Sequence, residues 1–258
     1  MKFQLALHTD AGVKKTINQD ALLVQTAATW RGRVCFAAVC DGVGGMEKGE
    51  LASSYLVHRL SDWFESSFAD CLREDSFENR LAQEWTCLLE SAGDAIRTYG
   101  YEHSMRMGTT ALLLLIAQGR YYIANVGDCR ACLLDQTFSQ LTVDQTYIQR
   151  EMDAGRMSRP EARRDPHRHM LLQCVGATLD LEPDFYMGRF YEGSTFLLCS
   201  DGFSHTLKEE EIFRTLSSRR VHGEEAMRRK LVSLTELCKK RGESDNISAV
   251  LIHCGEEN

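Results

Sequence analysis

Aspartates at the ends of apolar stretches are the residues of this sequence with the clearest chemical potential. Residues 34–40 are apolar and suited to a β-strand, and they lead directly into Asp41-Gly42-Val43-Gly44-Gly45. A buried lone carboxylate is costly unless it is paired or holds a cation, and glycines let the backbone approach whatever it binds. Taken alone, this motif fits an ordinary Asp-Gly turn equally well.

The same pattern recurs four more times along the chain. Asp128 and Asp201 follow β-like segments, whereas Asp20 and Asp245 precede them. In an antiparallel sheet the entrance of one strand lies beside the exit of its neighbour, so these carboxylates and Asp41 can gather at one edge. Like charges so close together would force protonation unless cations neutralise them. The sequence therefore predicts a metal cluster.

An oxygen-only ligand set favours Mg²⁺ or Mn²⁺ over zinc, which prefers histidine or cysteine. Two such ions about 4 Å apart can activate a water and hold a phosphoryl group during in-line displacement. Hydrolysis of phosphate monoesters is among the slowest uncatalysed reactions and needs this electrostatic help. No cysteine is followed at the sixth position by arginine, and there is no Walker-type phosphate loop. Metal-assisted phosphate ester hydrolysis is the chemistry that fits.

Alternating and helical patterns predict the elements that position these aspartates. Residues 1–8, 111–117 and a hairpin through Gly119-Arg120 have the character of strands. Apolar residues at three- and four-residue spacings predict helices from about Glu47 and over residues 78–99, 208–216 and 223–240. We expect an α+β fold in which helix pairs cover both outer faces of an antiparallel β-sandwich, with residues 1–258 forming one domain.

Residues 144–170 interrupt this pattern with a polar, charged segment. The segment holds six arginines and two histidines, and its short helical pieces lie near Gly155 and Pro160. A solvated excursion and a mobile flap over the site are equally good interpretations, because loops between strands often carry function.

Composition narrows the class of protein. The formal charge of −7 and a pI near 5.7 give no electrostatic basis for binding nucleic acid. The N-terminus lacks a signal peptide and no apolar stretch approaches ~20 residues, so we expect a cytoplasmic protein without a membrane segment. The ten cysteines are expected to be reduced core residues. Cys129 and Cys132 lie three apart in a predicted strand and so face opposite sides, which disfavours a redox or zinc pair.

Eight short motifs, taken in order, resemble the PP2C (PPM) family of metal-dependent serine/threonine phosphatases, and most closely its short bacterial members. These motifs are Asp10-Ala-Gly12, Asn18-Gln-Asp20, Asp41-Gly-Val-Gly-Gly45, Gly108-Thr-Thr110, Asn125-Val-Gly-Asp128, Leu141-Thr-x-Asp144, Cys199-Ser-Asp201-Gly202 and Asp245-Asn246. The match covers nearly the whole chain, so it is far more specific than any single Asp-Gly pair.

The resemblance implies a binuclear Mn²⁺ or Mg²⁺ centre at one end of the sandwich. The implied ligands are Asp20, Asp41, Gly42 through its carbonyl, Asp128, Asp201 and Asp245. In that scheme Asp41 bridges both ions, Asp201 and Asp245 complete the shell of one, and Gly42 and Asp20 serve the other. Bacterial relatives bind a third, weaker ion near Asp128 and Asp201. The nucleophile would be a metal-bridging water, with no phosphoenzyme.

The resemblance also implies phosphoserine and phosphothreonine proteins as substrates and a cognate serine/threonine kinase as the opposing enzyme. A monomer is the default expectation. Residues 142–177, including residues 171–176, are similar to the family's flap and the strand after it.

Three positions depart from the family's pattern. Lys15 stands where an arginine usually grips the substrate phosphate, which keeps the charge but loses the bidentate fork. Val43 replaces the histidine of eukaryotic members, and Asp165-Pro166 replaces a flap His-Pro, although His167 and His169 are close by. Asp41, Asp201 and Lys15 are the residues we expect to act in catalysis. A catalytically weak regulatory or phosphoprotein-binding module and a metal-dependent nuclease are the alternative functions.

Overall fold

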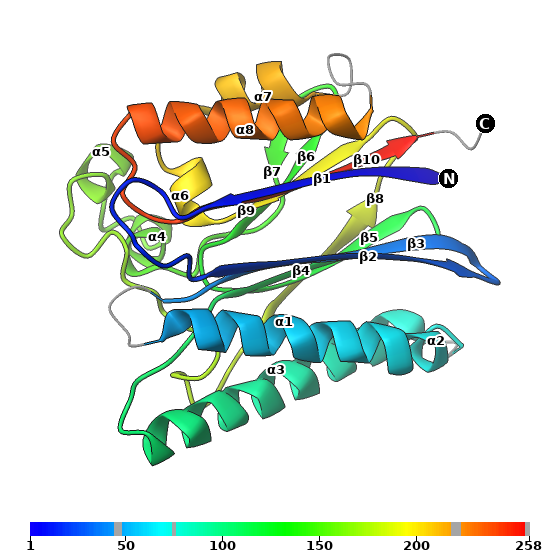
Figure 1. Cartoon of the computed structure of the whole chain (residues 1–258), viewed down its shortest axis with the longest axis horizontal. Helices are drawn as coiled ribbons and strands as arrows, with labels where there is room; N and C mark the ends of the chain where they lie inside the picture. Colours follow the sequence, from blue (N-terminus) through cyan, green and yellow to red (C-terminus); the bar gives the residue numbers. More distant parts are fainter. Residues whose placement is uncertain (44–47, 74–75, 218–222, 256–258) are drawn as a thin grey trace.

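Two five-stranded antiparallel sheets pack face to face, and helices cover both outer faces (Figure 1). The computed structural model describes residues 1–43, 48–73, 76–217 and 223–255. The first sheet has the order β1-β10-β9-β6-β7 and the second β2-β3-β4-β5-β8. The strands of the first sheet are β1 (Lys2–Asp10), β10 (Ile247–Gly255), β9 (Thr195–Cys199), β6 (Arg130–Leu134) and β7 (Phe138–Gln140). Those of the second are β2 (Asp20–Thr29), β3 (Gly32–Asp41), β4 (Ala111–Ala117), β5 (Arg120–Val126) and β8 (Asp184–Arg189).

The helices divide between the two outer faces and the flap. Those against the second sheet are α1 (Gly49–Ser66), α2 (Phe68–Cys71) and α3 (Phe77–Glu102), and those against the first are α6 (Asp201–Ser204), α7 (Glu209–Leu216) and α8 (Glu224–Lys240). Two short flap helices, α4 (Tyr147–Asp153) and α5 (Arg159–Ala162), lie at one end of the sandwich, on the left in Figure 1.

Strand β3 is buried on both of its faces. Its alternate residues Phe36 and Ala38 pack in the core shared with α1 and α3, whereas Ala37 and Val39 pack in the core between the two sheets. All four side chains are fully buried. Because both faces are covered, the strand is a continuous apolar run rather than an alternating one.

The strand register places the site-bearing ends of both sheets at the same end of the molecule. In the second sheet Asp20, the first residue of β2, is paired with Asp41, the last residue of β3. In the first sheet Cys199, the last residue of β9, is paired with Arg130 at the start of β6 and with Ala249 near the start of β10. This is the end where α4, α5 and α6 lie in Figure 1.

The predicted α+β sandwich with helices on both outer faces is confirmed. Four short elements were not predicted from the sequence: α2, β7, β8 and α6. The strand expected over residues 171–176 is wrong, because this stretch forms only isolated bridges at Leu171 and Val175. Gly44, Gly45 and Glu47 of the predicted motif and helix start lie outside the described residues.

None of the ten cysteines forms a disulfide bond, and nine of them are buried. Cys129 packs in the core between the sheets and Cys132 in the core beneath α7 and α8, on opposite faces as predicted. Among the residues described, none of the helices combines the length and the apolar character that crossing a membrane requires.

Candidate active site

Five aspartates meet at the end of the sandwich where the strands of both sheets terminate. Asp20 and Asp41 lie on neighbouring strands of the second sheet. Asp128 lies in the turn between β5 and β6, which carries the chain from the second sheet to the first. Asp201 follows β9, and Asp245 precedes β10. The predicted convergence therefore draws on two sheets rather than on one edge of a single sheet.

Burial and mutual repulsion raise the pKa of three of these five carboxylates, those of Asp20, Asp41 and Asp128. Burial raises the pKa of Asp41 well above its usual range, and the charges of Asp20, Asp201, Asp128 and Asp245 raise it further. The pKa of Asp128 is raised well above its usual range by burial and by the charge of Asp201. Burial raises the pKa of Asp20 to about 6, with the charge of Asp201 adding to the effect. Without cations, the cluster therefore holds protons near neutral pH.

Three carboxylate oxygens in this cluster test whether divalent cations fit. Among the described residues, both side-chain oxygens of Asp20 and the Oδ1 of Asp201 are buried and have no hydrogen-bond partner. Buried acceptors are normally paired, and an unpaired one costs about 1–3 kcal/mol. Hard divalent cations satisfy such oxygens directly. The donor set, all oxygen and largely buried, fits Mg²⁺ or Mn²⁺.

The backbone around Asp41 is fixed by the Gly108-Thr-Thr110 motif. The Asp41 N–H donates to Oγ1 of Thr110 at 2.9 Å, and the Asp41 carbonyl accepts from the Thr110 N–H at 2.8 Å and from the Thr109 hydroxyl at 3.0 Å. The next residue, Gly42, lies so close to the start of α1 that a Cβ there would be 2.5 Å from the Gly49 carbonyl carbon and oxygen. The predicted metal-binding carbonyl of Gly42 thus belongs to a tightly packed backbone.

Asn246 joins the loops that carry the other predicted ligands. Its side chain is almost fully buried. Its Oδ1 accepts from the Gln19 N–H at 2.9 Å, and its Nδ2 donates to the carbonyls of Ala11 at 3.0 Å and Ile17 at 3.2 Å. These bonds fix the segment before Asp20 against the start of β10. The sequence pattern included Asn246 but gave no indication of this positioning role.

Lys15 extends from the loop between β1 and β2 to the edge of the cluster. Its Nζ lies 3.2 Å from Oδ1 of Asp245, and both side chains are about one-third exposed. An exposed ion pair of this kind adds little to stability. Its importance is positional, because it places a cation beside the aspartates. This is the location that a phosphate-binding lysine requires, and it differs from the solvated loop lysine that is the usual alternative.

Comparisons with known proteins agree with this geometry. Residues 9–237 match the family model for protein phosphatase 2C. The chain belongs to the protein phosphatase 2C family. It is 33% identical over 218 residues to the serine/threonine phosphatase stp of Listeria welshimeri, covering 83% of this chain and 82% of the relative.

Solved structures of bacterial phosphatases share the whole fold of this PP2C chain. The serine/threonine phosphatase of S. agalactiae superimposes with a TM-score of 0.84 at 27% identity, covering 98% of this chain and all of that one. The catalytic domain of the phosphatase PstP, solved in complex with two manganese ions, has a TM-score of 0.78 at 25% identity and covers 98% of this chain and 99% of that one.

Two histidines lie against the aspartate cluster of this PP2C phosphatase. His169 comes from the flap and His205 from the end of α6, and the Nδ1 atoms of both rings face Oδ2 of Asp201. The sequence drew attention to His169 but not to His205. The signal for His205 was its position four residues after Asp201, since residues at this spacing share one face of a helical turn.

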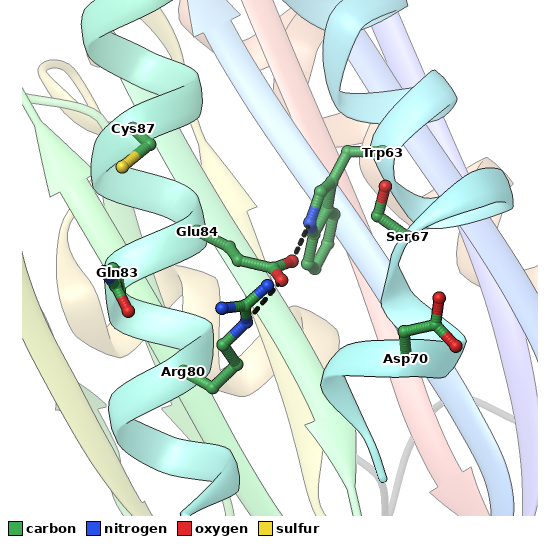
Figure 2. A pocket seen from close by; sticks show the side chains of 7 residues that line it. All are labelled: Trp63, Ser67, Asp70, Arg80, Gln83, Glu84 and Cys87. Atoms are coloured by element: carbon green, nitrogen blue, oxygen red, sulfur yellow. Dashed lines mark hydrogen bonds and ion pairs between the residues drawn. The ribbon is translucent and has the colours of Figure 1, made fainter. Parts of the chain in front are cut away.

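A pocket between α1, α2 and α3 is separate from this site (Figure 2). On its wall Glu84 accepts hydrogen bonds from Nε1 of Trp63 at 2.6 Å and from Nε of Arg80 at 2.7 Å. Its lining contains none of the five clustered aspartates. In Figure 2 the bond between Trp63 and Glu84 joins α1 to α3, whereas that between Arg80 and Glu84 lies within α3.

Proposed function

We propose that this PP2C phosphatase hydrolyses phosphoserine and phosphothreonine in proteins, with two Mn²⁺ or Mg²⁺ ions held by the aspartate cluster. The observation that carries the proposal is the meeting of five aspartates from both sheets, with buried oxygens of Asp20 and Asp201 left without partners. The Listeria relative and the S. agalactiae structure are both serine/threonine phosphatases, and the PstP structure contains two manganese ions. Neither the regulatory-module nor the nuclease alternative is favoured by any of these observations.

Each ligand has a proposed place in the centre. Asp41, whose carboxylate is under the charge of four other aspartates, would serve both ions. Asp201 and Asp245 serve one ion, and Asp20 with the carbonyl of Gly42 serves the other. Asp128, on which Asp201 exerts the largest repulsion, is the proposed ligand of a third, weaker ion.

Divalent cations bound there supply two effects, a lowered pKa for water and neutralisation of phosphoryl oxygens. The chain's own residues hold the proposed metal ligands in place. The Thr109 hydroxyl donates to the Asp41 carbonyl and the Asp41 N–H donates to Oγ1 of Thr110, and these bonds fix the strand end that carries Asp41. Asn246 fixes the loop segment before Asp20. No covalent bond between enzyme and phosphate is required, since the pattern of cysteine and arginine typical of a thiolate phosphatase is missing from the sequence.

Lys15 is the proposed ligand of the substrate phosphate. Its ammonium group neutralises Asp245 in the structure. If Asp245 held a cation, the Lys15 ammonium group would be free to bind a dianionic phosphate beside it. Lysine binds phosphate as a point charge rather than through a bidentate fork, so weaker substrate binding is expected than with arginine.

We further propose that the phosphorylated substrates come from a serine/threonine kinase and that the enzyme acts as a monomer in the cytoplasm. The ten cysteines, none of which forms a disulfide bond, support a reducing compartment.

The test is phosphate release from a phosphothreonine peptide with Mn²⁺, with Mg²⁺ and with chelator. Asp201→Asn should lose metal-dependent turnover while keeping its fold by circular dichroism. Asp180→Asn, at an exposed loop position, is the matched control and should keep full turnover. A fully active Asp201→Asn would refute the assignment. Absence of turnover in folded, metal-loaded wild type would favour a regulatory module.

A further inference from the structure

His169, His205 and Asp201 form a compact group on the outer side of the aspartate cluster. The Nδ1 atom of His169 lies 3.8 Å from Oδ2 of Asp201, and that of His205 lies 3.7 Å from the same oxygen. The two rings are 5.0 Å apart at an interplanar angle of 66°. One ligand atom from each of the three residues lies within 4.8 Å of the others.

These separations suit ligands of one ion better than hydrogen-bond partners. A nitrogen and an oxygen 3.7–3.8 Å apart are too distant for a good hydrogen bond. In a tetrahedral site with bonds near 2.1 Å, neighbouring ligand atoms are separated by about 3.4 Å. Small rotations of the two exposed imidazoles close the remaining difference.

The backbone positions of both histidines are well fixed. The His205 N–H donates to the carbonyl of Asp201 at 2.8 Å, so the two residues are held one helical turn apart. On the flap side, the carbonyl of Met170, next to His169, accepts from the Tyr147 N–H at 2.9 Å at the start of α4. The imidazoles come from different segments, yet both segments are anchored beside Asp201.

The two oxygens of Asp201 face different surroundings. Its Oδ1 is buried without a hydrogen-bond partner, whereas Oδ2 faces the two histidines. The side chain of Asp201 is 13% exposed, and those of His169 and His205 are 51% and 31% exposed, so an ion can enter from solvent. Asp201 can therefore contribute one oxygen to the oxygen-only centre and the other to a second site.

We propose that His169, His205 and Oδ2 of Asp201 form a separate cation site, selective for Zn²⁺ and similar imidazole-preferring ions. Two imidazoles and one carboxylate suit Zn²⁺, Co²⁺ and Ni²⁺, whereas the aspartate cluster suits Mg²⁺ and Mn²⁺. A water completes the fourth position of the zinc site. The site goes beyond the proposed hydrolysis and does not depend on it, because binding is measurable in a protein without turnover.

The test is a Zn²⁺ titration against a chromophoric chelator in excess Mg²⁺, which occupies the oxygen-only centre. Wild type should bind one Zn²⁺ ion that Mg²⁺ does not displace. His169→Gln and His205→Gln should each weaken this binding at least about tenfold, and the double variant should abolish it. Affinity for Mn²⁺, measured in the same proteins by calorimetry, should change little.

His167→Gln is the matched control. This variant removes an imidazole from the same flap, two residues from His169, but His167 lies beside Asp165 and Tyr147 rather than Asp201. It should bind Zn²⁺ as wild type does. Equal Zn²⁺ affinity in wild type and in both single variants would overturn the proposal, because the zinc would then lie on carboxylates alone.

A second measurement needs no variant. Co²⁺ added to the Mg²⁺-loaded wild type should give the intense visible absorption of a four-coordinate site with nitrogen ligands. Only the weak bands of six-coordinate Co²⁺ would contradict the proposed site, even if the substituted proteins failed to fold.

Discussion

Replacing Asp20 with asparagine should stabilise the metal-free protein at neutral pH, although it removes a proposed metal ligand. The carboxyl of Asp20 has a pKa of about 6 in the folded protein, against an ordinary value of 3.8. Below the ordinary value the group is protonated in both states and has no effect. Between 3.8 and about 6 only the unfolded state loses the proton, so stability falls as the pH rises through this window.

The size of the effect follows from the two pKa values. At 1.36 kcal/mol per pKa unit, their difference corresponds to about 3 kcal/mol, reached in full above about pH 6. At about pH 5 roughly half of this cost is present. Asparagine is nearly isosteric and cannot ionise. Asp20→Asn should therefore unfold with a free energy up to about 3 kcal/mol higher than wild type at pH 7.5, and with a smaller gain at pH 5.

Urea denaturation in the presence of chelator, at both pH values, measures this difference. Asp180→Asn, at an exposed loop position, should shift the free energy of unfolding by less than about 0.5 kcal/mol at either pH. Saturating Mn²⁺ should reverse the order, because wild type binds the ion and Asp20→Asn binds it poorly. If Asp20→Asn destabilises the metal-free protein equally at both pH values, the idea of an electrostatically frustrated cluster is wrong.

Other substitutions test the parts that position the site. Asn246→Ala removes three hydrogen bonds to buried backbone and should lower the free energy of unfolding by about 2–4 kcal/mol. Calorimetry should also show weaker Mn²⁺ binding. Asn79→Ala, at an exposed position on α3, is the control and should leave both quantities unchanged. Equal stability of the two variants would contradict the positioning role of Asn246. Lys15→Ala should raise KM for a phosphopeptide more than it changes Mn²⁺ affinity, whereas Lys15→Arg should keep or lower KM; unchanged steady-state kinetics in Lys15→Ala would return Lys15 to an ordinary exposed cation. Gly202→Ala places a Cβ 2.1 Å from the carbonyl oxygen of Asn246 and should destabilise by about 3 kcal/mol or more, so an unaltered melting temperature would refute the close packing.

The elements that carry the aspartates were predictable because each one has a strong local signal. The strand before Asp41 is continuously apolar, and a glycine follows Asp41. The helix over residues 78–99 repeats its apolar side chains with helical spacing. The family resemblance supplied the order of the motifs and hence the fold. Strand β8 escaped prediction because it is at the edge of its sheet and mostly exposed, so it lacks an apolar run.

The contacts within the site were less predictable, because they join residues distant in sequence. Asn246 bonds to the backbone of Ala11, more than 200 residues away, and nothing in its local sequence indicates that partner. His169 meets His205 only because the flap returns to the end of α6. Burial of a helix or strand face appears in the sequence as a periodic pattern of apolar residues. Tertiary hydrogen bonds and the placement of the flap produce no such pattern.

The cluster and its surroundings explain why cations should act on folding as well as on chemistry. An ionised Asp20 costs the metal-free protein about 3 kcal/mol, and Asp41 and Asp128 are under the same kind of stress. A cation whose free concentration is one hundred times its dissociation constant stabilises the folded protein by about 2.7 kcal/mol for each site. For Asp20 alone the two quantities are similar, so binding of one cation would offset roughly the cost of ionising this carboxylate. The apolar strands that end at these aspartates hold the ligands together, and Lys15 beside Asp245 balances part of their charge.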